Sequence, residues 1–117
     1  MNELESKYRM LLLGLKPLAT SYEKQLKLYP DFVALPDELA LDFDDGYQLV
    51  PELKDAGLIS QPAFDLLSQI DQLLEQMTNR EKGDVWSMEG FKQNPVWQEC
   101  RALAINALME LKEELPE

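Results

Sequence analysis

Leucines and aromatic residues recur along this chain at steps of three and four residues, the spacing that places side chains on one face of an α-helix. No stretch of useful length alternates apolar and polar residues, as a half-buried strand would. We therefore predict an all-α fold, a compact bundle of four to five helices, in which residues 1–117 form a single helical domain.

The first apolar stripe runs from Leu4 to Tyr29 and is interrupted by Gly14 and Pro17. Proline has no backbone N–H and clashes with the preceding turn, so the first helix is predicted to be kinked near Lys16 or split there. The stripe keeps its phase across the interruption, which favours the kink. The helical region is expected to end at Tyr29, because a proline follows it.

A second helix is predicted to start at Pro36, with Asp37 and Glu38 in the first turn, where carboxylates meet the positive end of the helix dipole. Pro51 should stop or bend this helix, and a last short turn should end at Gly57. The apolar face of this region consists of Leu35, Leu39, Phe43, Tyr47 and Val50.

Three further helix starts are marked by side chains that accept hydrogen bonds from backbone N–H groups. Ser60 should cap the clearest amphipathic helix of the chain, and Ser87 should cap a short one. Asn94, followed by Pro95, should cap the last helix, which is expected to fray at Pro116.

Charge is distributed unevenly along the chain. The formal net charge is −11, from 22 acidic and 11 basic residues. Residues 30–53 contain seven acidic residues and no lysine or arginine. Such a surface repels nucleic acid and anionic lipid and accelerates encounter with a basic partner. We therefore expect a basic protein partner, and neither nucleic-acid nor membrane binding.

The sequence also predicts a location. No run approaches the roughly 20 apolar residues that a membrane-spanning helix needs. Residues 1–5 are acidic where a secretory signal would be basic. A lone cysteine, Cys100, cannot form an internal disulfide, which agrees with a reducing compartment. The expected location is the cytoplasm.

The absence of histidine argues against catalysis, because histidine is the usual general base at neutral pH and the commonest zinc or iron ligand. Cys100 lies in an apolar-periodic segment and is predicted to be a buried structural thiol. Asp45 and Gly46 fit two positions of a calcium-loop template, but Leu41 and Phe43 then fall on ligand positions. We expect no enzymatic activity, no cofactor and no metal site.

The acidic segment has two interpretations, a solvated face that keeps the protein in solution and a docking surface for a basic partner. Trp97 falls on the apolar stripe of the last helix and is predicted to be a core residue, whereas Trp86 follows residues 80–84, a predicted loop, at a loop–helix junction. On the docking hypothesis the partner-binding residues are Asp37, Asp42, Asp44, Asp45 and Glu52, with Tyr47 and Trp86 as anchors.

The residues LPDELALDFDDGY at 35–47, together with VWS at 85–87 and NPVW at 94–97, resemble small acidic α-helical immunity proteins of bacterial polymorphic and contact-dependent toxin systems. Size and charge are similar as well. The resemblance implies that an acidic helix face fills the basic active-site cleft of a cognate toxin, for example a nuclease.

Other functions are compatible with the same residues. The main alternative is a self-associating structural or adaptor protein, a homo-oligomer that pairs through an exposed apolar face of its last helices. Another is a nucleic-acid mimic that sequesters a DNA-binding protein, which differs from an immunity protein only in its partner. An enzyme that works without histidine ranks last.

Overall fold

The computed structural model describes residues 2–31, 33–79 and 83–116, and all regular secondary structure within these ranges is helical. This confirms the all-α prediction for the described residues. The elements are α1 (Glu3–Ala19), α2 (Tyr22–Gln25), α3 (Leu35–Tyr47), α4 (Val50–Asp55), α5 (Gln61–Asn79), the 3₁₀ turn η1 (Gly83–Trp86), α6 (Met88–Gln93) and α7 (Pro95–Glu110). They outnumber the predicted four to five because short helices occupy connections between the long ones.

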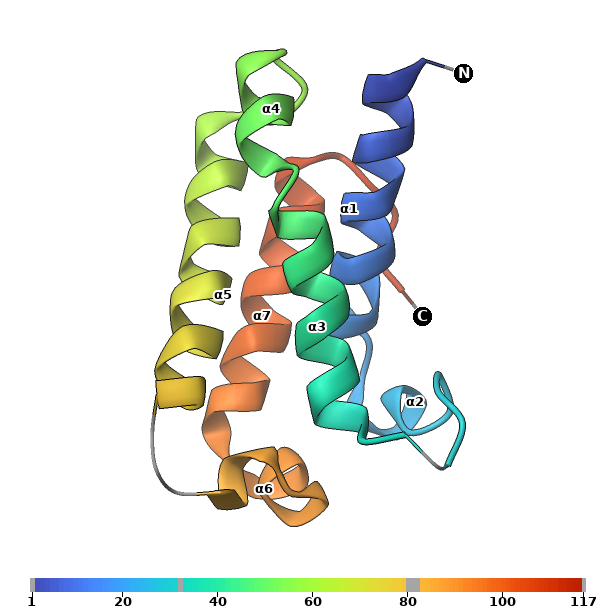
Figure 1. The fold of residues 1–117 in the computed structure, drawn as a ribbon, viewed down its shortest axis with the longest axis vertical. Coiled ribbons are helices and arrows are strands. Elements are labelled where there is room, and N and C mark those ends of the chain that lie inside the picture. Colours follow the sequence, from blue (N-terminus) through green and yellow to red (C-terminus); the bar gives the residue numbers. More distant parts are fainter. Residues whose placement is uncertain (1, 32, 80–82, 117) are drawn as a thin grey trace.

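The four long helices, α1, α3, α5 and α7, stand side by side, and each runs antiparallel to the long helix before it (Figure 1). The short helix α4 covers one end of the bundle, and α2 and α6 lie at the other (Figure 1). Contacts are extensive between α1 and α3, between α5 and α7, and between α1 and α7, but sparse between α3 and α5. The bundle is therefore closed on three sides and more open on the fourth.

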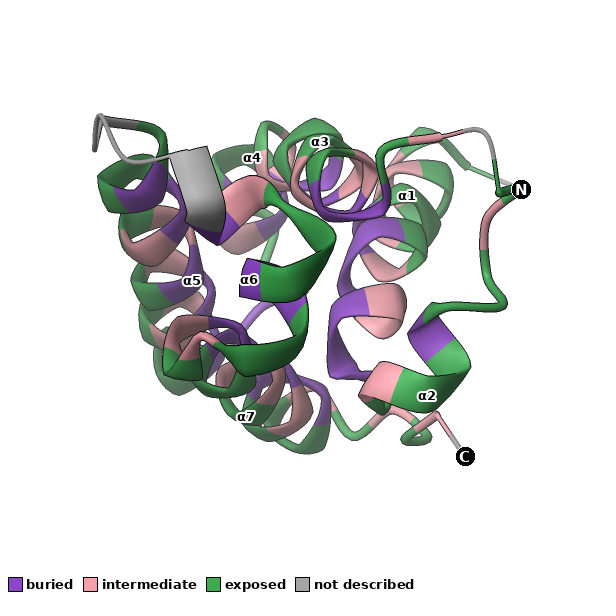
Figure 2. Ribbon diagram, turned by 90° about the horizontal axis from the view of Figure 1, so that it is seen from below, coloured by how far each residue is buried: buried purple, intermediate pink, exposed green. Residues whose placement is uncertain are grey.

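The inward faces of the long helices form one apolar core (Figure 2). Trp97 and Cys100 of α7 are both buried in it, as predicted. Burial raises the pKa of the Cys100 thiol to about 12, so the thiol stays protonated at neutral pH. No helix in the described ranges is both long enough and apolar enough to cross a membrane.

Two glycines allow α1 and α3 to cross at backbone contact distance. A β-carbon on Gly14 would lie 2.2 Å from the carbonyl oxygen of Asp42, and one on Gly46 would lie 2.9 Å from the Cα of Leu11. Any larger residue would force the two helices apart, because protein interiors have no free space for extra atoms. Gly14, which interrupts the apolar stripe in the sequence, is therefore a packing residue.

The first helix is shorter than predicted. α1 continues through Gly14 and Pro17 and ends at Ala19, so it is not split at Pro17 and does not reach Tyr29. Thr20 has the extended backbone of a helix end, with φ −79° and ψ 148°. A bend of the helix axis near Pro17 stays a prediction.

Polar groups around the end of α1 explain why it stops there. Gln25 is 1% exposed, and its side-chain amide donates to the carbonyl of Pro17 at 3.0 Å. The Thr20 hydroxyl donates to the carbonyl of Lys16 at 2.9 Å, and Arg101 of α7 donates to the Gln25 side-chain oxygen at 2.8 Å. The last carbonyls of a helix lack intrahelical donors, so these bonds stabilise the end of α1 and fold α2 back onto it.

The three predicted helix caps are confirmed. In each case the side-chain oxygen accepts a hydrogen bond from a backbone N–H in the first turn of the helix. The pairs are Ser60 with the N–H of Ala63 at 3.3 Å, Ser87 with that of Gly90 at 3.0 Å, and Asn94 with that of Val96 at 3.0 Å.

The boundaries around α4 differ slightly from the prediction. α3 begins at Leu35, one residue before the predicted start, and ends at Tyr47 rather than at Pro51, which lies in the first turn of α4. Gly57 follows α4 with φ +81°, a left-handed conformation that suits glycine and confirms the predicted end of this turn.

α7 ends at Glu110, well before Pro116, where fraying was predicted. Lys112 has φ +60°, so the chain leaves the helix through a left-handed residue that is not glycine. The C-terminal residues then turn back along α1 (Figure 1). There the Tyr8 hydroxyl donates to the Glu113 carboxylate at 2.8 Å.

Candidate functional site

A groove of about 690 Å³ runs between α3 and α5, on the open side of the bundle. We call it the acidic groove. It is lined by Asp37, Ala40, Leu41, Phe43 and Asp44 of α3, by Asp71, Leu74, Glu75 and Thr78 of α5, and by Trp86 of η1.

Helix geometry explains why its carboxylates face one another. Asp37 and Asp44 are two turns apart on α3, and Asp71 and Glu75 are one turn apart on α5, so each pair lies on one face of its helix. Apolar side chains also line the groove, among them the buried Phe43 and Leu74 and the exposed Leu41. The groove therefore combines carboxylates with apolar side chains.

Trp86 contributes a fixed aromatic ring to the lining of the groove. It is half-buried, and its indole N–H donates to the carbonyl of Met77 at 3.3 Å. Its ring packs edge-on against Trp97, with centroids 5.6 Å apart and an interplanar angle of 83°. These contacts hold the indole in place, and its exposed part remains free to meet a ligand.

Among the residues that the structure describes, the charged side chains lining the groove are all acidic, and none is a lysine or an arginine. Burial, followed by the negative charges of Glu75 and Asp44, raises the pKa of Asp71. Asp44 accepts a hydrogen bond from the Gln48 amide at 3.4 Å, a long contact to a neutral group. A cation in the groove would therefore relieve repulsion among these carboxylates.

The structure brings three of the seven predicted partner-binding residues into this groove. Asp37 and Asp44 form part of one wall, and Trp86 lies beside them. Of the predicted loop 80–84, residues 80–82 lie outside the described residues, and η1 begins at residue 83. Trp86 therefore ends a 3₁₀ turn just before α6, which agrees with the predicted junction.

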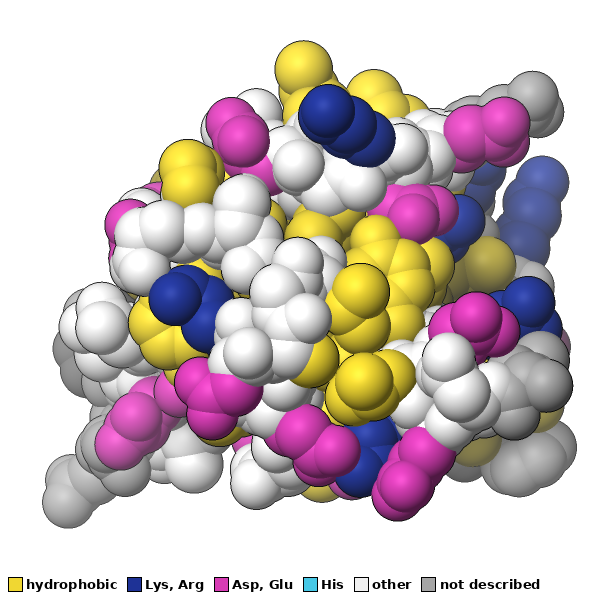
Figure 3. Space-filling view, turned by 90° about the horizontal axis from the view of Figure 1, so that it is seen from above, with side chains coloured by type: hydrophobic (Ala, Val, Ile, Leu, Met, Phe, Trp, Pro, Cys, Tyr) yellow, Lys and Arg dark blue, Asp and Glu magenta, His cyan; other side chains and the backbone are white. Residues whose placement is uncertain are grey.

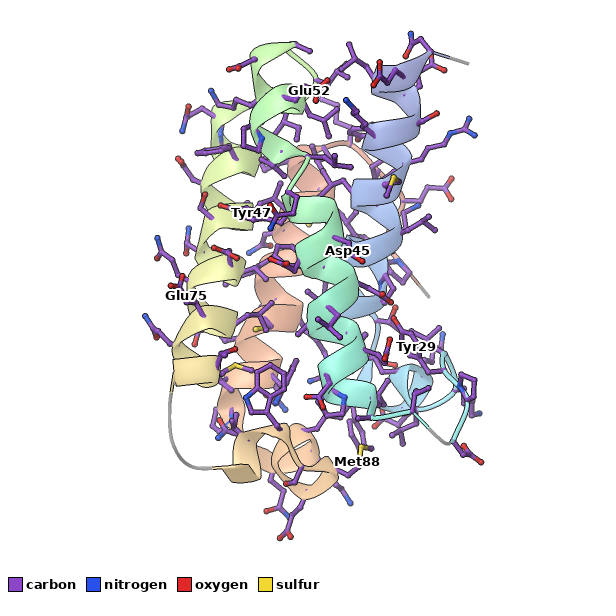
Figure 4. All side chains as sticks on the ribbon, viewed as in Figure 1. Tyr29, Asp45, Tyr47, Glu52, Glu75 and Met88 are labelled. Carbon is purple, nitrogen blue, oxygen red and sulfur yellow. The ribbon has the colours of Figure 1, made fainter. Side chains whose placement is uncertain are left out.

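The other four predicted residues do not line the groove. Figure 4 shows Glu52 near one end of the molecule and Asp45 and Tyr47 near its middle. Asp45 is exposed on α3, whereas the Tyr47 hydroxyl is 3.2 Å from that of Ser68. The acidic segment is thus not displayed as a single surface, because successive residues of a helix point in different directions.

Two of these carboxylates have partners within the chain. Asp42 accepts a hydrogen bond of 2.5 Å from the Tyr29 hydroxyl. Glu52 forms an ion pair with Lys7, with 2.7 Å between nitrogen and oxygen. At the end of the bundle formed by α4 and the start of α1, charged side chains of both signs surround a group of apolar ones (Figure 3). Neither Asp42 nor Glu52 lines the acidic groove.

Asp71 and Glu75 were not among the predicted site residues. They lie on the polar face of α5, opposite its apolar stripe, and a polar face normally points to solvent. Their spacing of one helical turn was visible in the sequence. The pairing of α5 with α3 across a groove was not, because it depends on how the helices pack.

The lining side chains of the acidic groove determine which ligands they suit. Among the described residues, no group of three or more histidine, cysteine, aspartate or glutamate side chains converges in a way that could hold a metal ion. Carboxylates beside an aromatic ring and apolar side chains suit the ammonium or guanidinium group and the alkyl part of a lysine or arginine.

In comparisons with known proteins, no family model, no curated protein and no solved structure matches the chain.

Proposed function

We propose that this protein is a binding protein that captures a basic segment of a partner protein in the acidic groove. The observation that carries the proposal is the set of four carboxylates, Asp37, Asp44, Asp71 and Glu75, which line one groove with Trp86, while no lysine or arginine is found among the lining residues that the structure describes.

Each part of the groove has a role in this proposal. The carboxylates attract lysine and arginine side chains, and the raised pKa of Asp71 supports a gain when a cation arrives. Trp86 offers an aromatic face to a cation or to the alkyl part of its side chain. The net charge of −11 steers a basic partner towards the molecule and accelerates association.

The biological role that we propose is that of a cytoplasmic immunity protein. Its partner is a toxin domain with a basic active-site cleft, such as a nuclease, and the segment held in the groove belongs to that cleft. This role rests on the resemblance of residues 35–47, 85–87 and 94–97 to such proteins. Inhibition would follow from occlusion, because a filled cleft cannot admit substrate.

A binding measurement with a defined probe tests the groove. The probe is a fluorescein-labelled peptide rich in lysine and arginine, and the readout is fluorescence anisotropy at low salt. Asp44→Asn/Asp71→Asn should weaken binding by about tenfold, since each lost charge contact contributes on the order of 1 kcal/mol. The matched control is Asp45→Asn/Asp55→Asn, which removes two charges from exposed residues outside the groove. Equal loss of affinity in both double variants would reduce the effect to net charge and refute the groove as the site.

A growth assay tests the immunity role separately. The protein is co-expressed with toxin domains encoded beside its gene, and wild type should restore growth whereas Asp44→Asn/Asp71→Asn should not. Peptide binding at the groove without any protection would reject the immunity role and keep the binding function. A stable homo-oligomer in sedimentation, unaffected by the groove variant, would favour the self-associating alternative.

A further inference from the structure

A second groove, of about 470 Å³, lies on the face of α1 that points away from α3. We call it the α1 groove. It is lined by Arg9, Leu12, Leu13, Lys16, Pro17, Thr20 and Leu28. It shares no residue with the acidic groove, and its rim carries the opposite charge.

Leu12 of this groove packs against the core, but Leu13 and Leu28 are exposed and are not part of it. The inner stripe of α1 is already complete, since Leu11, Leu15 and Leu18 are all buried. Leu13 is 73% exposed and Leu28 is 48% exposed. Single exposed leucines are ordinary, but leucines gathered around one concave surface mark interaction sites.

The two cations of the groove are available to a partner. Within the described part of the chain, neither Arg9 nor Lys16 forms an ion pair, whereas Lys7 on the same helix pairs with Glu3 and Glu52. Arg9 and Lys16 are seven residues apart, so they flank the leucines two helical turns from each other. An apolar groove between two unpaired cations is complementary to leucine-type side chains flanked by carboxylates.

We propose that the α1 groove is a docking surface for an acidic amphipathic helix of a partner protein. Apolar side chains of that helix pack against Leu12, Leu13 and Leu28, and its carboxylates pair with Arg9 and Lys16. This surface is separate from the acidic groove and does not depend on the function proposed for it. The protein then has two docking surfaces for segments of opposite charge.

The charges disfavour a second copy of this chain as the occupant. If two α1 helices packed antiparallel about Leu13, Arg9 of one copy would lie beside Lys16 and Pro17 of the other. Like charges would meet at both ends of the contact, which is destabilising. A partner helix of opposite charge has no such conflict.

A membrane surface is also a poor occupant. An extended anionic surface meets the field of the whole molecule, which has a net charge of −11. A helix seated in the groove responds mainly to charges within a Debye length of about 8 Å, and Arg9 and Lys16 are the charged residues that line it. The net negative charge therefore repels an extended anionic bilayer, whereas Arg9 and Lys16 attract the carboxylates of a helix seated in the groove.

The test measures binding of a labelled amphipathic helical peptide that carries leucines on one face with glutamates beside them. Its neutral twin has glutamine in place of glutamate. We expect the glutamate peptide to bind the wild-type protein at least about tenfold more tightly than the twin does. Leu13→Gln should weaken binding of the glutamate peptide by about tenfold or more, because a buried leucine contact is lost. Arg9→Gln/Lys16→Gln should remove the difference between the two peptides.

Matched variants separate these effects from general changes. Met109→Gln replaces another exposed side chain, 59% exposed on α7, and should bind the peptide as wild type does. Lys24→Gln/Lys92→Gln removes two exposed positive charges outside the groove and should preserve the preference for glutamate.

Three outcomes would overturn the proposal. The first is equal binding of the glutamate peptide by wild type and Leu13→Gln, with both folded by circular dichroism. The second is binding to phosphatidylglycerol vesicles that Leu13→Gln abolishes, which would identify a membrane site. The third is self-association of the wild type that Leu13→Gln abolishes, which would identify a second copy as the occupant.

Discussion

The two sides of α3 are packed in opposite ways. Towards α1, the helix approaches so closely that Gly46 faces the backbone at Leu11 and Gly14 faces the carbonyl of Asp42. Towards α5, the same helix stands back and leaves a groove walled by carboxylates such as Asp44. A small bundle can thus concentrate its tight packing on one face of a helix and leave the other face open to a ligand.

The carboxylates of α3 follow this division. Asp42, near the tight side, accepts a hydrogen bond from the Tyr29 hydroxyl, while burial and this bond raise the pKa of Tyr29. Asp44, two residues further, faces the acidic groove and has only the long contact from Gln48 among the described residues. Near α1, the carboxylate of Asp42 stabilises the fold through its hydrogen bond. In the acidic groove, the carboxylate of Asp44 adds repulsion that a cationic ligand would relieve.

Gly14→Ala should have the largest effect on stability, because it introduces a clash where α1 and α3 are in backbone contact. The added β-carbon would lie 2.2 Å from a backbone oxygen that cannot move without displacing α3. We expect a loss of about 3 kcal/mol in the free energy of unfolding, measured by urea denaturation.

Gly57→Ala is the control for that measurement. Its β-carbon would meet nothing within 4 Å, but its φ of +81° disfavours alanine, so we expect a loss of about 1 kcal/mol. A loss for Gly14→Ala no greater than this would mean that the α1–α3 crossing adapts easily, and the contrast between the two sides of α3 would disappear.

Two substitutions that are two residues apart should differ in their effect on the free energy of unfolding. Asp42→Asn weakens the acceptor of the Tyr29 hydroxyl and should lower the free energy of unfolding by about 1 kcal/mol. Asp44→Asn removes a repelling charge from the groove and should leave stability unchanged or raise it slightly. Both are measured by urea denaturation at pH 7, and Tyr29→Phe should reproduce the loss seen for Asp42→Asn. Equal losses for Asp42→Asn and Asp44→Asn would contradict the division.

Asp71→Asn should have the smallest effect, and its pH dependence is the informative part. Because the pKa of Asp71 is raised in the folded state, the folded protein binds this proton more tightly than the unfolded chain does. The ionised group therefore lowers stability at neutral pH, and this penalty fades as the pH falls towards the unfolded value of about 3.9.

Asp71→Asn should accordingly be more stable than wild type at pH 7, by an amount that shrinks as the pH is lowered towards 4, in thermal melts across this range. Gln72→Ala, a change at an exposed uncharged neighbour, should differ from wild type by the same amount at every pH. A constant difference for Asp71→Asn as well would show that the groove carboxylates do not repel one another.

Local signals in the sequence predicted the elements well and their ends less well. Ser60, Ser87 and Asn94 cap their helices through bonds within one turn, so neighbouring residues were enough to find them. The end of α1 depends on Gln25 and on Arg101 of α7, which are far apart in sequence. In the sequence, nothing distinguishes Gln25, which donates to a carbonyl at the end of α1, from a glutamine exposed on the surface.

The sequence predicted only part of the candidate site. Asp37, Asp44 and Trp86 were selected for charge and aromaticity, and these properties also matter in the groove. Asp42 and Glu52 were selected by the same rule, but their partners Tyr29 and Lys7 belong to other elements. Composition cannot separate a paired carboxylate from an unpaired one, because pairing is a property of neighbours in space.

The sequence by itself determined that the chain is helical, where most helices begin, that Trp97 and Cys100 are buried, and that residues 30–53 carry acidic charge without a lysine or arginine. These properties follow from periodicity, capping and composition, which act between residues near each other in the chain. Only the tertiary structure decided that Gly14 and Gly46 close one side of α3, while Asp71 and Glu75 face Asp37 and Asp44 across the other. Helix packing decides which residues meet across a gap, and it depends on the shapes of all the helices at once.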